Sequence, residues 1–196
     1  MARPFNTHER RREILDAFRQ VMAERGYVGA TIAEVARVAG LRPGLVHYHF
    51  ESKLAILLAL LDDLASGIEA RNKTRVGRSH QDALKAFIDA HVATGDDADP
   101  SAVACWVTIG TEAVRQPEVR GAYAEAVGKE LQRLELLVSN CLLDRGRPTD
   151  QAPIIAAAIY AGIQGAYQLS TTVRELVPRG FSAPTLHALA SKLIDG

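Results

Sequence analysis

The chain has 196 residues, and its 23 Lys and Arg balance its 23 Asp and Glu, so the formal net charge at pH 7 is zero. Its two cysteines, Cys105 and Cys141, lie in no Cys-x-x-Cys or Cys/His spacing, which argues against a disulfide framework and a zinc site. No signal peptide opens the sequence, and no uncharged run approaches the roughly 20 residues of a membrane span. We therefore expect a cytoplasmic protein with no membrane segment, no metal and no cofactor.

The charge is unevenly distributed along the chain. Residues 1–53 carry nine Lys or Arg against six Asp or Glu, and residues 54–196 carry fourteen against seventeen. The N-terminal part is therefore the basic part, and a surface that contacts phosphate needs such a local excess. A solvated charge run is the alternative for each residue taken alone. The basic residues that could form a phosphate-contacting cluster are Arg10, Arg11, Arg12, Arg37, Arg42 and Lys53.

The first predicted helix begins near Thr7, after a loose arm at residues 1–6. Its apolar residues recur at three- and four-residue spacing, which places them on one helical face. Gly26 ends this helix. The residues on the apolar face are Ile14, Leu15, Phe18, Val21 and Met22.

The next stretch predicts two short helices joined by a tight turn. Thr31 and Glu34 have the spacing of a capping box, in which each side chain satisfies a backbone N–H group at a helix start. Gly40 supplies the backbone conformation of a sharp helix exit, and Pro43 suits the first turn of the following helix. Val46 closes a small core between the two helices. This is the geometry of a helix-turn-helix, whose second helix fits a DNA major groove.

The remaining sequence predicts six further helices and no strand. Their apolar residues fall at about residues 54–68, 84–91, 103–113, 119–142, 151–174 and 184–194, with a bend at residues 72–79 and an acidic loop at residues 96–99. The predicted fold class is all-α. An N-terminal three-helix head, residues 1–53, is joined by a long helix to a C-terminal helical domain for ligand sensing and dimerisation, residues 54–196.

The helix expected from residue 151 carries small residues on one side, which lets another helix come close. Together with leucines of the last helix, these residues predict a four-helix seam between two subunits of a homodimer. Packing within one chain is the alternative. The residues of the predicted dimer interface are Ala158, Gly162, Gly165, Leu169, Leu186, Leu189 and Leu193.

Aromatic and polar residues of the C-terminal domain predict a pocket for a small molecule. A mostly apolar cavity with a few polar groups is what such a site requires. A core position is the more common role for each of these residues taken singly, so only the group supports a pocket. The predicted pocket residues are Phe87, His91, Trp106, Ile109, Tyr123, Tyr160, Gln164 and Tyr167.

The head resembles the DNA-binding domain of the TetR family of bacterial regulators over residues 8–55. The resemblance is carried by Gly26-Tyr27, Thr31-Ile32, the Ala36 to Gly40 spacing, Gly44, the block His47-Tyr48-His49-Phe50, and Ser52-Lys53. It implies a repressor that binds a double-stranded DNA operator as a dimer and is released by a small-molecule effector. The DNA-binding residues that it implies are Thr31, Arg42, Pro43, Gly44, Leu45, His47, Tyr48, His49 and Lys53.

Two positions depart from the usual family pattern. Many members have Ser or Thr where Arg42 stands, and a small or hydroxyl residue where Leu45 stands. Both positions face DNA in the family, so the operator sequence does not carry over to this chain. The C-terminal domain resembles the choline-sensing BetI branch from Trp106 to Pro117 and in the helix that follows. A quaternary ammonium or an apolar or aromatic effector is compatible with the residues.

Two other function classes stay open from the residues. An all-α enzyme would need a nucleophile or acid with its base, and the pairs available are Cys105 with His91 or Glu112 with His187; neither pair has a catalytic signature. A helical ligand-binding module with a non-functional head is the other alternative. Salt-dependent DNA binding separates the regulator from both, and we expect a regulator that is not an enzyme.

Overall fold

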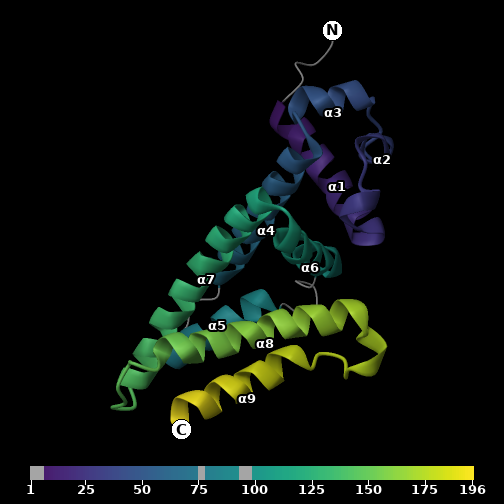
Figure 1. Cartoon of the computed structure of the whole chain (residues 1–196). Helices are drawn as coiled ribbons and strands as arrows, with labels where there is room; N and C mark the ends of the chain where they lie inside the picture. The colour runs from purple at the N-terminus through teal and green to yellow at the C-terminus, as the bar shows by residue number, and fades with distance from the viewer. Residues whose placement is uncertain (1–6, 75–77, 93–98) are drawn as a thin grey trace. The chain divides into compact units, whose positions relative to one another are not determined.

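The computed structural model describes residues 7–74, 78–92 and 99–196 (Figure 1). The predicted arm at residues 1–6, the centre of the predicted bend and most of the predicted acidic loop lie outside the described residues. Helices and no strands make up the regular structure of the described part, which confirms the all-α prediction.

The helices follow one another with short connections. A short 3₁₀ helix, Arg174–Leu176, follows α8. Within the described ranges, no helix is both long enough and apolar enough to span a membrane. The helices are α1 (Thr7–Gly29), α2 (Ile32–Val38), α3 (Pro43–His49), α4 (Lys53–Thr74), α5 (His80–His91), α6 (Pro100–Arg115), α7 (Pro117–Leu143), α8 (Ala152–Thr172) and α9 (Ser182–Asp195).

Contacts divide the chain into two compact units. Unit 1 comprises Met1–Leu64 and Ser101–Tyr123, and unit 2 comprises Ala65–Pro100 and Ala124–Gly196. The helices α4 and α7 therefore contribute to both units, and α6 packs with the N-terminal helices. The sequence placed a functional boundary after residue 53, which remains a prediction, whereas the packing boundary runs through α4 and α7.

The core of the head forms where α1, α2 and α3 meet. The apolar face predicted for α1 is buried here, except that Leu15 is only partly covered. Val46 of α3 is fully buried, as expected for the residue that closes this core. The residues that fill the core are Ile14, Phe18, Val21, Met22, Ala30, Val35, Ala36, Val46 and Phe50.

Helix ends in the head follow the sequence signals closely. Gly26 adopts φ 67° inside α1, so the regular helix breaks at the predicted residue. Ser52 accepts a hydrogen bond from Ala55 N at 3.1 Å and caps α4. Of the predicted capping box, one half is present, because Thr31 Oγ1 accepts from Glu34 N at 3.2 Å. The predicted bond from the Thr31 N–H group to the Glu34 carboxylate is absent, so this half of the prediction is wrong.

The Glu34 carboxylate does not reach back to the Thr31 backbone, since two arginines hold it. Arg37 donates to both of its oxygens, at 3.0 and 2.8 Å, and Arg25 pairs with it at 2.9 Å. The Thr31 N–H group instead donates to Gly29 O at 2.9 Å. The hydrogen bond from Arg37 and the charge of Arg25 lower the pKa of Glu34. A charged donor therefore competes successfully for this carboxylate.

Candidate nucleic-acid interface and effector domain

The turn between α2 and α3 fixes the direction of α3. Gly40 lies in the left-handed region at φ 66°. Its N–H group donates to Arg37 O at 3.3 Å, and Leu41 N donates to Ala36 O at 2.8 Å. These two bonds form a Schellman motif, which ends α2 sharply and satisfies its last carbonyl groups. The predicted helix exit is therefore present at the predicted glycine.

Two cations from outside α3 hold the end of α3 and the start of α4. Arg11 of α1 donates to His49 O at 2.6 Å, and its guanidinium lies 4.0 Å from the centre of the Phe50 ring. Lys53 donates to Tyr27 O at 2.8 Å, and its Nζ lies 4.0 Å from the centre of the Tyr27 ring. Burial lowers the pKa of Lys53 and raises that of Tyr27. Both side chains therefore brace the head from within.

The outer surface of α3 carries most of the predicted DNA-binding residues. Tyr48 is 79% exposed, which is unusual for a large aromatic residue with no packing role, and its ring lies edge-on to His49 at 5.1 Å. Thr31, before α2, is also exposed. The exposed residues on or beside α3 are Arg42, Pro43, Gly44, His47 and Tyr48, whereas Leu45, His49 and Lys53 are half-buried.

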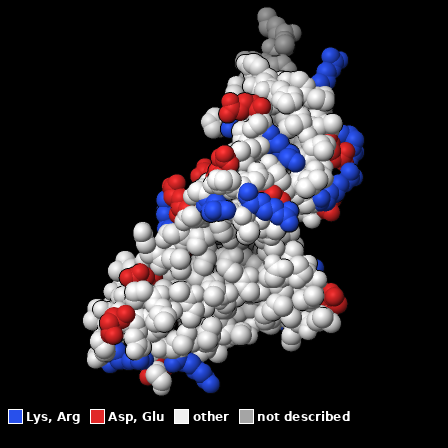
Figure 2. Space-filling model, viewed as in Figure 1, with Lys and Arg blue, Asp and Glu red and all other residues white. Residues whose placement is uncertain are grey.

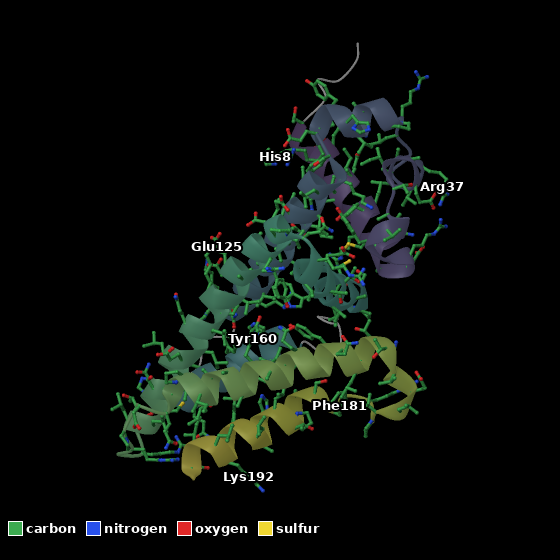
Figure 3. All side chains as sticks on the ribbon, viewed as in Figure 1. His8, Arg37, Glu125, Tyr160, Phe181 and Lys192 are labelled. Atoms are coloured by element: carbon green, nitrogen blue, oxygen red, sulfur yellow. The ribbon has the colours of Figure 1, made fainter. Side chains whose placement is uncertain are left out.

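The basic residues predicted to contact phosphate differ in the ion pairs and hydrogen bonds that they form within the chain. Arg10 pairs with Glu13 at 2.5 Å, and Arg12 lies 3.7 Å from Asp63. Arg37 is bound to Glu34 and projects from the outer side of α2 (Figure 3). Among these cations, Arg42 alone has no ion pair or side-chain hydrogen bond within residues 7–74, 78–92 and 99–196. Figure 2 shows the resulting mixture of both signs on the head.

The predicted pocket residues fall into two groups, one in each unit. In unit 1, the rings of Trp106 and Tyr123 lie 5.4 Å apart, and Ile109 is fully buried beside them on α6. Burial raises the pKa of Tyr123, opposed by a hydrogen bond with Trp106. The other five predicted residues lie in unit 2. The pocket stays a prediction, and each group is an aromatic cluster within its own unit.

His91 is the centre of the group in unit 2. It is 3% exposed, and its Nδ1 lies 2.9 Å from Phe87 O. The Phe87 ring is 4.2 Å and the Tyr160 ring 6.1 Å from the imidazole, and Tyr160 points from α8 toward α5 (Figure 3). Tyr167 donates its hydroxyl to His91 O at 2.9 Å. The partly buried Gln164 lies on α8 between these tyrosines in sequence.

Sequence reasoning missed Glu130, which faces this group from α7. Its Oε2 lies 3.3 Å from His91 Nε2, and its side chain is only 13% exposed. The signal was weak, because Glu130 follows Lys129 in a helix with charges on several sides. Only the fold shows that this carboxylate points inward.

A hollow in unit 2 lies between α5, α7 and α9, and its lining includes none of the predicted pocket residues. Two of its polar residues lie next to carboxylates: His187 Nε2 is 2.9 Å from Asp89, and Arg145 binds Asp195 at 2.5 Å. The buried thiol of Cys141 lines it, and burial raises its pKa. We therefore assign no ligand to this hollow.

The residues predicted for the dimer interface lie on or near the contact of α8 with α9. Gly162 belongs to the contact within one chain, since a Cβ there would lie 2.7 Å from Leu186 Cδ2. Gly165 faces open space, and Leu169 and Leu189 are exposed. Ala158 and Leu193 are half-buried.

An exposed stripe on α8 shares Gly165 with the predicted interface and otherwise lies one residue away from the predicted Ala158 and Gly162. Ile154 is 71% exposed, and Ala157, Ala161 and Gly165 continue its side of the helix. Figure 2 shows almost no charge over the middle of α8 and α9. Both sides of α8 carry small residues, so the spacing alone did not distinguish the outer side from the side that packs on α9.

The residues considered for catalysis have other roles. Cys105 donates its thiol to Arg19 O at 3.4 Å in unit 1, and burial raises its pKa to about 12. His91 and His187 belong to unit 2, where they face Glu130 and Asp89. Glu112 of α6 lies near Lys53 and Tyr27, where its charge opposes the fall in the pKa of Lys53.

Comparison with known proteins identifies both parts of the chain. Residues 14–60 match the family of bacterial regulatory proteins described as tetR family, and residues 80–196 match the BetI-type transcriptional repressor C-terminal family. The HTH-type transcriptional regulator BetI of Rhizobium meliloti is 31% identical over 163 residues, which cover 81% of this chain and 76% of BetI. The HTH-type transcriptional regulator CymR of Pseudomonas putida is 28% identical over 74% of this chain and 71% of its own.

Solved structures share the fold. A crystallised protein from Saccharomonospora viridis in complex with choline has a TM-score of 0.79 and 23% identity, and the match covers 96% of each chain. Together with the helix-turn-helix geometry of the head, the matches over residues 14–60 and 80–196 establish the family. The chain belongs to the TetR family and is a helix-turn-helix transcriptional regulator with a BetI-type C-terminal domain.

Proposed function

We propose that this regulator is a repressor that binds an operator in double-stranded DNA as a homodimer and leaves it when a small molecule binds the C-terminal domain. The single observation that carries the DNA-binding part is the outer surface of α3. Arg42, which has no ion pair or side-chain hydrogen bond within the described residues, lies at its start, and Tyr48 is 79% exposed on it. The inner side of the same helix is packed through the fully buried Val46. Such a protein works where the DNA is, so we also propose a cytoplasmic location.

The depth of a recognition helix in the major groove suggests how the α3 residues divide their roles. We assign Arg42, Leu45 and His47 to base edges, because the helix enters the groove with its N-terminal residues. The residues that position the DNA backbone are Thr31, Tyr48, His49 and Lys53, and the backbone of Pro43 and Gly44 lies at the entering end of the helix. With one N–H on Tyr27 O, the Lys53 ammonium keeps two donors that can reach phosphate.

Two features support a dimer: one head contacts few base pairs, and α8 and α9 of unit 2 carry exposed small and apolar residues. A single recognition helix reads too few base pairs for a specific site, whereas two heads related by a two-fold axis read two half-sites. We place the seam on the exposed stripe of α8 and on the outer side of α9. The exposed Leu169 and Leu189 and the open Gly165 support this face.

The small-molecule effector is proposed to act through α4. This helix begins at Lys53, beside the recognition helix, and continues into the residues of unit 2. Two heads must match fixed half-sites together, so a ligand that favours another arrangement of the heads lowers the affinity for DNA. The choline complex of the Saccharomonospora viridis protein supports a small organic molecule as the class of effector.

Selection from a random DNA library tests the proposed function. The full-length protein is expected to enrich an inverted repeat whose half-site centres lie about one helical turn, or a multiple of it, apart. A footprint over both half-sites should appear with two chains per repeat. Enrichment of a single unrepeated site would contradict the dimer. No enrichment over bulk DNA would leave a ligand-binding module with a non-functional head as the better account.

A further inference from the structure

The hydrogen bond between His91 and Phe87 determines what the other nitrogen of the imidazole offers. A carbonyl oxygen can only accept, so His91 Nδ1, 2.9 Å from Phe87 O, carries a proton. An imidazole that carries its single proton on Nδ1 presents the lone pair of Nε2 toward Glu130, 3.3 Å away. That nitrogen is buried and finds no hydrogen-bond partner within the described part of the chain.

Glu130 offers a second acceptor at the same place. A carboxylate accepts hydrogen bonds and donates none. Its Oε2 is buried, lies 3.3 Å from His91 Nε2 and also has no hydrogen-bond partner among the described residues. A closed ion pair would bring these atoms to about 2.7–2.9 Å with good geometry. Two acceptors therefore face each other, and no donor from residues 7–74, 78–92 or 99–196 is hydrogen-bonded to either.

The surroundings of this pair favour a compact, positively charged group. Phe87 and Tyr160 place aromatic rings beside the imidazole, and aromatic faces attract cations. Tyr167 uses its hydroxyl on His91 O, and Arg71 of α4 donates its Nε to Ala90 O at 2.8 Å. Both hydrogen bonds hold the backbone around His91 and direct neither donor onto Nε2.

We propose that the effector carries a protonated amine whose N–H groups donate to Glu130 Oε2 and His91 Nε2. This inference rests on the proposed function, because it specifies the ligand of the same C-terminal domain. A fully methylated ammonium has the same charge and no N–H group, so it leaves both acceptors unsatisfied. The pair thus selects an amine with hydrogen-bond donors over its methylated counterpart.

Two minimal cations test this selection without any assumption about the rest of the effector. Methylammonium chloride and tetramethylammonium chloride are added to the wild-type protein at equal concentration, with sodium chloride as the reference for ionic strength. Methylammonium is expected to raise the melting temperature by about 2–4 °C once it exceeds its Kd several-fold. Tetramethylammonium is expected to give the sodium chloride value.

The variant Glu130→Gln removes the negative charge of the carboxylate and keeps the size of the side chain. Its amide can donate to His91 Nε2, so the ligand-free variant should fold, and the methylammonium shift should disappear. Glu135→Gln changes an exposed carboxylate on the same helix and should keep the full shift. Should Glu130→Gln fail to fold, the comparison of the two cations on the wild-type protein still decides the question.

Three results would overturn the inference. Tetramethylammonium could stabilise the wild-type protein as much as methylammonium does, neither cation could shift it, or Glu130→Gln could keep the shift. Operator binding by the wild-type protein without added cation is measured in the same preparation. If the operator is bound but the cation result is negative, the effector class is wrong and the proposed function stands. Loss of operator binding would instead contradict the proposed function.

Discussion

At the scale of single residues, cations of the same type have different tasks in the head. Arg11 and Lys53 donate to backbone carbonyls of His49 and Tyr27 and lie over aromatic rings, so they stabilise the fold. Arg42 has no such bond within the described part of the chain and lies at the start of α3. The sequence marked all three as basic residues near the predicted interface and could not separate them, because their partners come from distant positions.

The two kinds of cation predict different effects on the free energy of unfolding. Lys53→Met removes the hydrogen bond to Tyr27 O and the cation over its ring, so the free energy of unfolding should fall by about 1–2 kcal/mol. Arg42→Ala removes no observed contact and should change it by less than about 0.5 kcal/mol. Urea titration of both variants measures the difference. Equal stability of the two variants would show that the Lys53 contacts contribute nothing to the fold in solution.

Acidic residues show the same limit of sequence reasoning. The capping spacing of Thr31 and Glu34 predicted two reciprocal bonds, and one of them is absent because Arg37 and Arg25 hold the Glu34 carboxylate. Glu130 looked like a surface residue of a long helix, and the fold placed it opposite His91. Arg25 and His91 lie far from Glu34 and Glu130 in the sequence or in another helix, so the local pattern around each carboxylate does not reveal these two contacts.

At the scale of elements, local signals predicted the helices well. Glycine at a helix exit and proline at a helix start act within four residues, and Gly40 and Pro43 each fulfil the predicted role. The outer side of α8 was harder to predict, because small residues occupy both sides of this helix. Its assignment needed the contact between Gly162 and Leu186, which the sequence does not specify.

Substitutions on the two sides of α8 should have different effects, one on dimer formation and the other on the stability of each chain. Gly165→Leu places a large side chain in open space on the outer side, so it should block close approach of a second chain and leave each chain folded. Gly162→Leu meets Leu186 of the same chain and should destabilise it by about 1–3 kcal/mol. Gly121→Leu, which is equally open on α7, controls for a new exposed leucine. Sedimentation of Gly165→Leu as an intact dimer would place the seam elsewhere.

At the scale of the whole molecule, the family assignment covers both the DNA-binding head and the C-terminal domain. Unit 1 contains a head whose recognition helix is held by its turn and by Arg11, and unit 2 contains a buried polar pair within an aromatic cluster. The fold class and the helix-turn-helix were predictable because helical periodicity and end signals are local. The grouping of α6 with the head was not predictable, because it depends on distant bonds such as that of Arg19 to Ser101 at 2.9 Å.

The most direct test of the central claim is the affinity of the protein for its selected operator and for scrambled DNA, measured by fluorescence anisotropy over a range of salt concentrations. The operator should bind at least about 10³-fold more tightly, and the logarithm of each affinity should fall linearly with that of salt. Arg42→Ala should reduce the preference for operator over scrambled DNA by about 5- to 150-fold. Equal binding of both DNAs, or an equal loss on both in Arg42→Ala, would contradict α3 as the element that reads sequence.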